Sequence, residues 1–126
     1  MLPPAHRLRR AADFTAVTRQ GRRVRSGSVV MYLLTEPAGG TSRVGLVVGK
    51  AVGTSVVRHQ VSRRLRAQLR LRLDRLPAGA ALVVRALPEA ATASSAALGR
   101  DLDRALTKLT DKLAASAAGP GARPGR

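Results

Sequence analysis

The segment from residue 55 to residue 70 constrains the fold of this 126-residue chain more than any other. It contains no proline, glycine or acidic residue, and Gly53-Thr54-Ser55 at its start offers a hydroxyl that can cap a helix. At about 100° per residue, one side of such a helix collects Val57, Val61, Leu65, Gln68 and Leu69. We therefore predict an amphipathic helix that packs its apolar side on a sheet.

The other side of this helix is cationic. It collects Arg58, Ser62, Arg63, Arg66 and Arg70, with His59 among them. Like charges on one helix repel each other unless a polyanion neutralises them, so we interpret this side as a phosphate-binding surface. A membrane surface is the competing polyanion. It is disfavoured because interfacial helices carry bulky Trp, Phe or Leu on their apolar face, whereas Val57, Val61 and Leu65 are typical of a helix that packs on a sheet.

Positive charge is concentrated in the first part of the chain. Lysine and arginine total 23 against 7 acidic residues, for a net charge of +16. Residues 1–72 hold 15 basic and two acidic side chains, whereas residues 73–126 hold eight and five. This charge predicts a soluble protein that binds a polyanion. The first half of the chain would form the binding surface, and the second half would complete the fold.

Several classes of protein are excluded by composition. The chain has no cysteine, which rules out disulfide scaffolds, thiol nucleophiles and thiolate metal sites. Its longest uncharged stretches run 10 residues, about half of what a membrane span needs. No apolar run follows the N-terminal arginines, so we expect no secretory signal and a cytoplasmic location.

The remaining elements predict an α+β sandwich. We expect one domain over residues 1–117 and a disordered Gly/Pro/Arg tail over residues 118–126. Helix 11–20 would end at Gly21 as its C′ glycine, and two strands would form an antiparallel hairpin with a long loop. The expected elements are helix 11–20, a short strand within 21–27, the hairpin strands 28–35 and 43–49, helix 55–70, strand 80–87 and helix 94–117.

The last of these helices shows what an ordinary solvated surface looks like in this chain. A leucine stripe faces the core, and the charges opposite it are mixed. The stripe is Leu98, Leu102, Leu106, Leu109 and Leu113, and the side chains expected to face water include Asp101, Arg104, Lys108 and Asp111.

The carboxylates and histidines of this sequence form no pattern typical of a catalytic site. Asp101 and Asp103 are two apart on a helix and point about 200° away from each other, so they cannot share a proton or a metal. His6 and His59 lie in basic surroundings with no carboxylate to orient either ring. Residues 49–55 depart from the Walker spacing. We predict no catalytic residue and no metal site in the protein.

Two segments carry a family resemblance. Residues 48–66 (VGKAVGTSVVRHQVSRRLR) resemble the signature of the bacterial ribonuclease P protein subunit, Gly/Ser-Lys-Lys-x-Gly-x-Ala-Val-x-Arg-Asn-x-x-Lys-Arg-x-x-Arg. Residues 7–14 (RLRRAADF) resemble its Arg-Leu-Lys-x-x-x-x-Phe opening. The resemblance spans residues 6–113; Ala51, His59 and Ser62 depart from the signature.

This resemblance implies both a fold and a function. The fold would be a two-layer α/β sandwich like the second domain of ribosomal protein S5, with a left-handed βαβ crossover through the arginine helix. The protein would bind a large catalytic RNA and the 5′ leader of precursor tRNA. The RNA would remove the leader to generate the mature tRNA 5′ end, with Mg²⁺ held mainly by the RNA and the substrate.

The resemblance also assigns candidate site residues. Those facing the catalytic RNA would be Arg58, His59, Ser62, Arg63, Arg66 and Arg70. A cleft between the first helix and the sheet would receive the leader, with Phe14, Tyr32, Lys50 and Arg10 as its binding residues. A core role for Phe14 and Tyr32 stays open at this point.

Two other functions are compatible with the composition. One is a non-catalytic ribosomal or RNA-chaperone protein with an S5-like fold. The signature at residues 48–66 is the feature that distinguishes a ribonuclease P subunit from such a protein. The other is a DNA-compacting protein, which would carry basic charge on several faces rather than on one helix.

Overall fold

The computed structural model describes Leu8, residues 11–35 and residues 41–118, with side chains as far as residue 112. A four-stranded sheet in the order β1-β2-β4-β3 forms its centre. The strands are β1 (Arg22–Ser26), β2 (Val29–Thr35), β3 (Arg43–Val47) and β4 (Ala80–Ala86). The helices are α1 (Ala11–Gln20), α2 (Ser55–Arg70) and α3 (Ser95–Ala118), with short 3₁₀ turns η2 (Lys50–Val52), η3 (Leu73–Arg75) and η4 (Pro88–Thr92).

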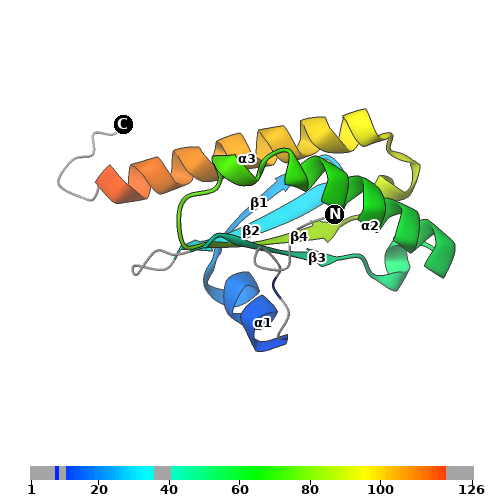
Figure 1. The fold of residues 1–126 in the computed structure, drawn as a ribbon, viewed down its shortest axis with the longest axis horizontal. Helices are drawn as coiled ribbons and strands as arrows, with labels where there is room; N and C mark the ends of the chain where they lie inside the picture. The colour runs from blue at the N-terminus through cyan, green and yellow to red at the C-terminus, as the bar shows by residue number, and fades with distance from the viewer. Residues whose placement is uncertain (1–7, 9–10, 36–40, 119–126) are drawn as a thin grey trace.

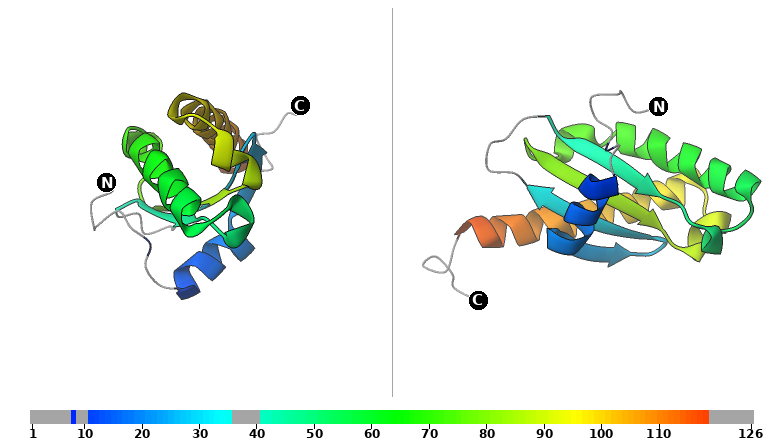
Figure 2. Two further views of the ribbon diagram at one scale, coloured as in Figure 1. Left: turned by 90° about the vertical axis from the view of Figure 1, so that its right-hand side faces the viewer. Right: turned by 90° about the horizontal axis from the view of Figure 1, so that it is seen from below.

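The helices cover the two faces of the sheet unequally. Helices α2 and α3 lie side by side on one face, and the shorter α1 lies on the other (Figure 1; Figure 2, left). The sheet and the α2–α3 layer form the expected α/β sandwich, and α1 adds a partial cover to the opposite face. Ala118, the first residue of the predicted tail, is the last residue of α3, and residues 119–126 lie outside the described part of the chain.

The connection from β3 through α2 to β4 is a left-handed crossover. Strands β3 and β4 pair in parallel, with Gly45 opposite Val83. Seen from below (Figure 2, right), both strands run the same way while α2 returns behind the sheet, and this arrangement is left-handed. About 98% of such crossovers are right-handed, so this feature is specific to few folds. It agrees with what the family resemblance implied.

The predicted hairpin between strands 28–35 and 43–49 is wrong. Strand β4 lies between β2 and β3 and pairs with both, antiparallel to β2 and parallel to β3. Ala80 to Val84 are all buried, so this apolar strand takes the central position, where both of its faces are covered. Strand β2 forms its hairpin with β1 instead, through a two-residue turn at Gly27 (φ 55°) and Ser28.

Gly21 ends α1 for a different reason from the one predicted. A C′ glycine usually adopts a left-handed conformation, but the glycines with positive φ in the described residues are Gly27, Gly53 and Gly79. A Cβ atom on Gly21 would lie 2.5 Å from the Val17 carbonyl oxygen and 2.9 Å from that of Leu33. Glycine is needed here because the end of α1 approaches the backbone of β2 closely.

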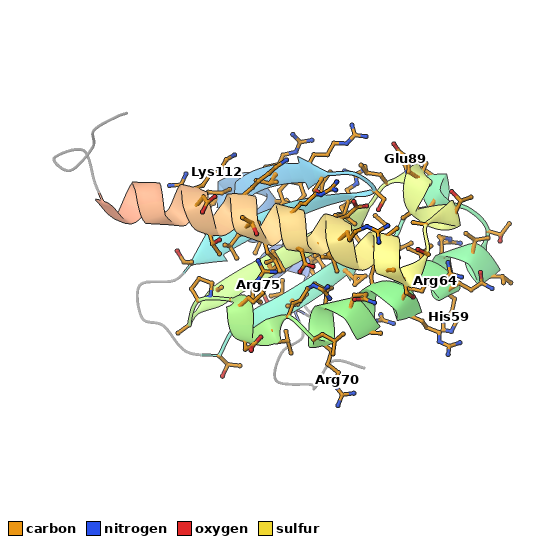
Figure 3. All side chains as sticks on the ribbon, turned by 90° about the horizontal axis from the view of Figure 1, so that it is seen from above. His59, Arg64, Arg70, Arg75, Glu89 and Lys112 are labelled. Carbon is orange, nitrogen blue, oxygen red and sulfur yellow. The ribbon has the colours of Figure 1, made fainter. Side chains whose placement is uncertain are left out.

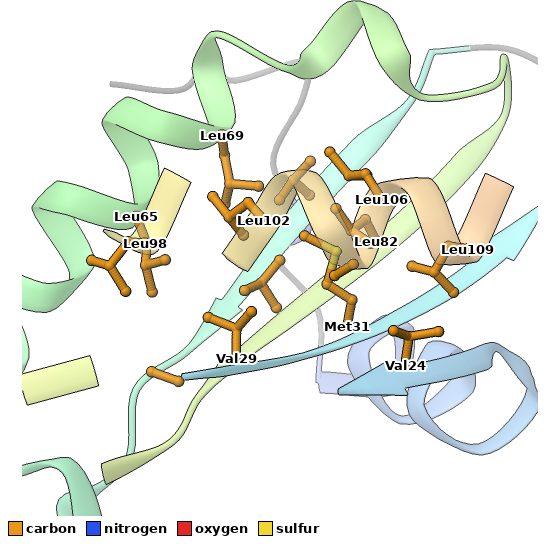
Figure 4. Packing of buried hydrophobic residues seen from close by; sticks show 14 of the residues in the cluster. Val24, Val29, Met31, Leu65, Leu69, Leu82, Leu98, Leu102, Leu106 and Leu109 are labelled. Atoms are coloured by element: carbon orange, nitrogen blue, oxygen red, sulfur yellow. The ribbon is translucent and has the colours of Figure 1, made fainter. Parts of the chain in front are cut away.

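The main core lies between the sheet and the α2–α3 layer (Figure 4). The leucines of α3 and the apolar side of α2 meet one face of β2 and β4 there, as the periodicity predicted. Its fully buried side chains include Met31, Leu65, Leu69, Leu82, Leu98, Leu102, Leu106 and Leu109. A smaller cluster of Leu8, Val17, Ala81 and Val83 lies under α1 on the opposite face.

The acidic residues of α3 tie the layers together, which corrects the expectation that Asp101 simply faces water. The Asp101 carboxylate accepts hydrogen bonds from the backbone N–H (3.0 Å) and the hydroxyl (2.6 Å) of Ser28. Asp103 accepts from Arg72 Nε at 2.7 Å and from Arg75 Nη1 at 2.8 Å. One aspartate therefore holds the β1–β2 turn, and the other holds the segment that follows α2.

The Asp103 contacts predict a pH-dependent contribution to stability. The hydrogen bond from Arg72, together with the charges of Arg72 and Arg75, lowers the pKa of Asp103 below its ordinary value of 3.8. A carboxyl whose pKa is lower in the folded state stabilises the fold above its unfolded pKa, and this contribution is lost as the pH falls through the folded pKa. Because the Asp103 side chain is 47% exposed, we expect less than about 1 kcal/mol.

Urea unfolding of the wild type and Asp103→Asn between pH 7 and pH 2 measures this contribution. The difference between their free energies of unfolding should shrink below about pH 4, where the carboxylate becomes protonated. A difference that stays constant down to pH 2 would show that the charge of Asp103 does not stabilise the fold.

Candidate nucleic-acid interface

The start of α2 is fixed by two residues of the predicted cap. The Thr54 hydroxyl accepts a hydrogen bond from the Val57 N–H at 3.3 Å, which satisfies one free donor of the first turn. Gly53 before it has a φ of 156°, and a Cβ atom there would lie 2.9 Å from Val57 Cγ1. These contacts set where the arginine helix begins, directly after η2.

The cationic side of α2 faces away from the sheet. His59, Arg63 and Arg70 are exposed, and Ser62 and Arg66 are half-buried. Within the described part of the chain, no carboxylate pairs with Arg63, Arg66 or Arg70. Figure 3 shows His59 and Arg70 on the outer side of α2, away from α3. These guanidinium groups are therefore available to an external anion.

Arg58 differs from the other arginines of the motif. The sequence placed it on the cationic side, but it lies about 20° from Leu65 around the helix, near the apolar side. Its Nε atom is buried and has no hydrogen-bond partner, while its Nη2 donates to Ser55 Oγ at 3.2 Å. Arg58 thus spans the border between the core and the cationic surface.

Two shallow hollows adjoin Arg63 and Ala67. The first, of about 330 Å³, is lined by Gln60, Arg63, Arg64, Ala67 and Ser95. The second, of about 450 Å³, is lined by His59, Arg63, Arg66 and Ala67. The small Ala67 side chain leaves space beside Arg63, so the surface is concave as well as cationic. Arg64 was absent from the predicted site; at about 100° per residue it lies about 20° from Val57, at the edge of the apolar side of α2.

The two aromatic residues lie together on the opposite face of the sheet. Tyr32 on β2 and Gly45 on β3 are both register partners of the buried Val83 on β4. A Cβ atom on Gly45 would lie 2.4 Å from Phe14 Cζ, so the Phe14 ring of α1 covers this glycine. Both rings are half-buried and pack against the small cluster under α1.

The other two residues predicted for this face are not observed next to the aromatic rings. Lys50 is exposed on η2, five residues beyond Gly45 and past the end of β3. Arg10 lies outside the described residues. The structure thus brings Phe14 and Tyr32 to one face and leaves Lys50 at the end of the neighbouring strand.

Comparison with known proteins assigns the family. The family model for ribonuclease P matches residues 2–110, which cover both surfaces described above. The chain belongs to the ribonuclease P protein family. The ribonuclease P protein component of Nocardioides sp. is 51% identical over 111 residues, covering 86% of this chain and 95% of the relative. That of Streptomyces bikiniensis is 50% identical over 117 residues, covering 86% and 95%.

Solved structures agree on the fold of this family. The ribonuclease P protein of Staphylococcus aureus superposes with a TM-score of 0.74 at 22% identity, covering 82% of this chain and 94% of that one. The protein from Thermotoga maritima gives a TM-score of 0.70 at 22% identity, covering 81% and 96%. The α+β architecture predicted from the sequence is confirmed.

Family membership decides between the functions that composition left open. A ribonuclease P protein component is the accessory subunit of an endoribonuclease that acts in tRNA processing. A ribonucleoprotein of this kind implies an RNA partner, as the cationic side of α2 indicated. Among the described helices, none is both long and apolar enough to cross a membrane.

Proposed function

We propose that this ribonuclease P subunit binds the catalytic RNA through α2 and the 5′ leader of precursor tRNA through the α1 face of the sheet. The observation that carries the proposal is the separation of two surfaces with different chemistry. Arginines that pair with no described carboxylate lie on the outer side of the helical layer, and two half-buried aromatic rings lie on the other side of the sheet. One protein can therefore hold both RNAs at the same time and promote leader removal.

The α2 surface suits a folded RNA. Arginine presents a planar fork of donors that bridges phosphate oxygens and stacks on exposed bases. Arg63, Arg66 and Arg70 are spaced three and four residues apart, so they follow one side of the helix. The hollows next to Arg63 add room for a base or a sugar between the phosphate contacts. His59 and Ser62 lie among these arginines and complete this interface with Arg58.

The α1 face suits a single strand. Tyr32 and Gly45 lie on either side of Val83, and the Phe14 ring lies over Gly45. Tyr32 and Gly45 are therefore two strand spacings apart, roughly 10 Å. Aromatic rings on a sheet are the usual platform for stacking the bases of unpaired nucleotides. Lys50, past the end of β3, supplies positive charge for the leader phosphates. Arg10, which lies outside the described residues, is proposed to do the same.

The protein leaves bond cleavage to its RNA partner. Asp101 and Asp103 are engaged by Ser28 and by Arg72 and Arg75. The residues with assigned positions include no group of three or more His, Cys, Asp or Glu side chains. In the proposed function, Mg²⁺ is held mainly by the phosphates of the RNA and the substrate. With this function we expect the protein in the cytoplasm, together with the tRNA that it processes.

The leader contact gives a prediction for the two rings. Phe14→Ala or Tyr32→Ala should weaken binding of precursor tRNA to the holoenzyme by roughly 5- to 150-fold, since a stacked ring contributes about 1–3 kcal/mol per base. Binding of mature tRNA, which lacks the leader, should change little. Equilibrium binding of both tRNAs to the assembled holoenzyme measures the difference.

Tyr32→Phe is the matched control, because it keeps a ring for stacking and should bind precursor tRNA like the wild type. Thermal unfolding of each variant separates a stacking role from a core role. Truncating a fully buried phenylalanine costs about 3–5 kcal/mol of stability. An equal loss of affinity for both tRNAs, or a protein that no longer folds, would assign the rings to the core.

A further inference from the structure

A second row of cations runs along the outer surface of α3. Its members are four residues apart and all are exposed: Arg100, Arg104, Lys108 and Lys112, here called the α3 ridge. Residues at this spacing are neighbours on a helix, and the ridge extends about 18 Å along the axis. It lies in the second part of the chain, which the sequence assigned to completing the fold.

The outer surface of α3 is mostly positive, because two of its three aspartates bind other parts of the protein. Asp101 points to the Ser28 turn, and Asp103 points to Arg72 and Arg75, so both carboxylates are used within the protein. Asp111 is the acid that stays exposed near the ridge. No hydrogen bond or ion pair joins Arg100, Arg104 or Lys108 to any other residue with a described position.

One end of the ridge contacts the edge strand of the sheet. Helix α3 packs over β1, and Lys112 Nζ donates to the Arg23 carbonyl oxygen at 3.3 Å. The side chains of Arg23 and Arg25 alternate with Val24, which is buried under α3, so they point to the other face of the sheet and are not part of the ridge. Figure 3 shows Lys112 beside β1, on the opposite side of the helical layer from Arg70.

We propose that the α3 ridge binds the phosphate backbone of a double-helical segment of the catalytic RNA, separate from the segment bound by α2. This inference rests on the function proposed above. Phosphate contacts require cations in a row and no base-reading groups, and RNA helices are recognised mainly through their backbone and shape. Neither α3 nor β1 carries an aromatic residue, so a stacked single strand does not fit this surface.

The position of the ridge favours the catalytic RNA over the precursor tRNA. Helices α2 and α3 form one layer, so an RNA that covers α2 can continue across α3 (Figure 2, left). The aromatic platform for the leader lies beyond the sheet, under α1. A large folded RNA can neutralise both rows of charge at once.

The absence of cysteine from the chain makes a direct test possible. Lys108→Cys and Arg66→Cys are each labelled with iron–EDTA and assembled with the catalytic RNA, with and without precursor tRNA. Hydroxyl radicals released at each position cleave nearby RNA. We expect Lys108→Cys to cut a double-helical segment of the catalytic RNA that Arg66→Cys does not cut.

The two positions separate failure of this inference from failure of the proposed function. Cuts from position 66 without cuts from position 108, or cuts from position 108 in the tRNA alone, would overturn the ridge contact. Identical cuts from both positions would also contradict a separate segment. No cuts from either position would contradict the α2 interface itself, and with it the function on which the inference rests.

A charge variant gives a second readout. Replacing Arg100, Arg104 and Lys108 by glutamine should flatten the dependence of log K on log salt by about 2–3 units for catalytic RNA binding, with an unchanged melting temperature. An unchanged salt dependence would show that the ridge only faces water.

Discussion

Glutamine in place of Arg63, Arg66 and Arg70 is expected to weaken binding of the catalytic RNA about 100-fold near 0.15 M salt. Three neutralised phosphates contribute a slope of about 2.7 to the dependence of log K on log salt, and the triple variant should lose this part. The melting temperature should barely change, because these side chains lie on the outer side of α2 and pair with no described carboxylate. Filter binding over a range of salt concentrations measures the effect.

Arg58 is left out of this variant because its Nε atom is buried and its loss would also disturb the start of α2. Arg19→Gln is the control: Arg19 is also an exposed arginine, but it lies on α1, on the other face of the sheet. It should leave the affinity for the catalytic RNA within a few-fold of the wild type. A triple variant with unchanged affinity and slope would show that the α2 arginines do not contact RNA.

The second large effect is expected from Leu102→Ala. This side chain is fully buried between α3 and the sheet, in the same cluster as Met31, Leu69 and Leu82 (Figure 4). Removing a buried leucine costs about 2–5 kcal/mol, because transfer free energy is lost and a cavity remains. Since a small domain is stable by only about 5–15 kcal/mol, a large part of its stability depends on this residue.

Urea unfolding followed by circular dichroism measures the loss at Leu102, and Leu102→Met is the control. The methionine keeps most of the volume and should cost less than about 1.5 kcal/mol. Affinity for RNA should fall only under conditions in which part of the Leu102→Ala protein is unfolded. A loss of stability below about 1 kcal/mol would contradict the central position assigned to Leu102.

Most elements of this fold could be predicted from local sequence. Helix 55–70 was predicted with its cap because an uninterrupted amphipathic pattern follows Thr54, and α3 was predicted from its leucine stripe. The pairing of strands could not be predicted in the same way. Strands β2 and β3 follow each other in the chain, but β4 lies between them because it is the strand that is buried on both faces. Periodicity shows which residues are apolar and not which strand is central.

The candidate site shows the same limit. The signature and the helical pattern predicted the position of the arginine helix, and Phe14 and Tyr32 do lie on one face. Sequence could not show that Arg58 is partly withdrawn into the protein, because this depends on where α2 sits on the sheet. It also could not show that Asp101 and Asp103 are used by other parts of the chain. The cationic row on α3 becomes visible only after these tertiary contacts are known.

Reconstitution with the cognate catalytic RNA tests the central claim most directly. The measurement is removal of the 5′ leader from precursor tRNA at low magnesium, where a basic protein that neutralises phosphate repulsion should have its largest effect. We predict rapid cleavage at the mature tRNA 5′ end by protein and RNA together, slow cleavage by the RNA alone and none by the protein alone. Cleavage by RNA-free protein that persists through repurification, or no stimulation of the RNA by the protein, would contradict this account.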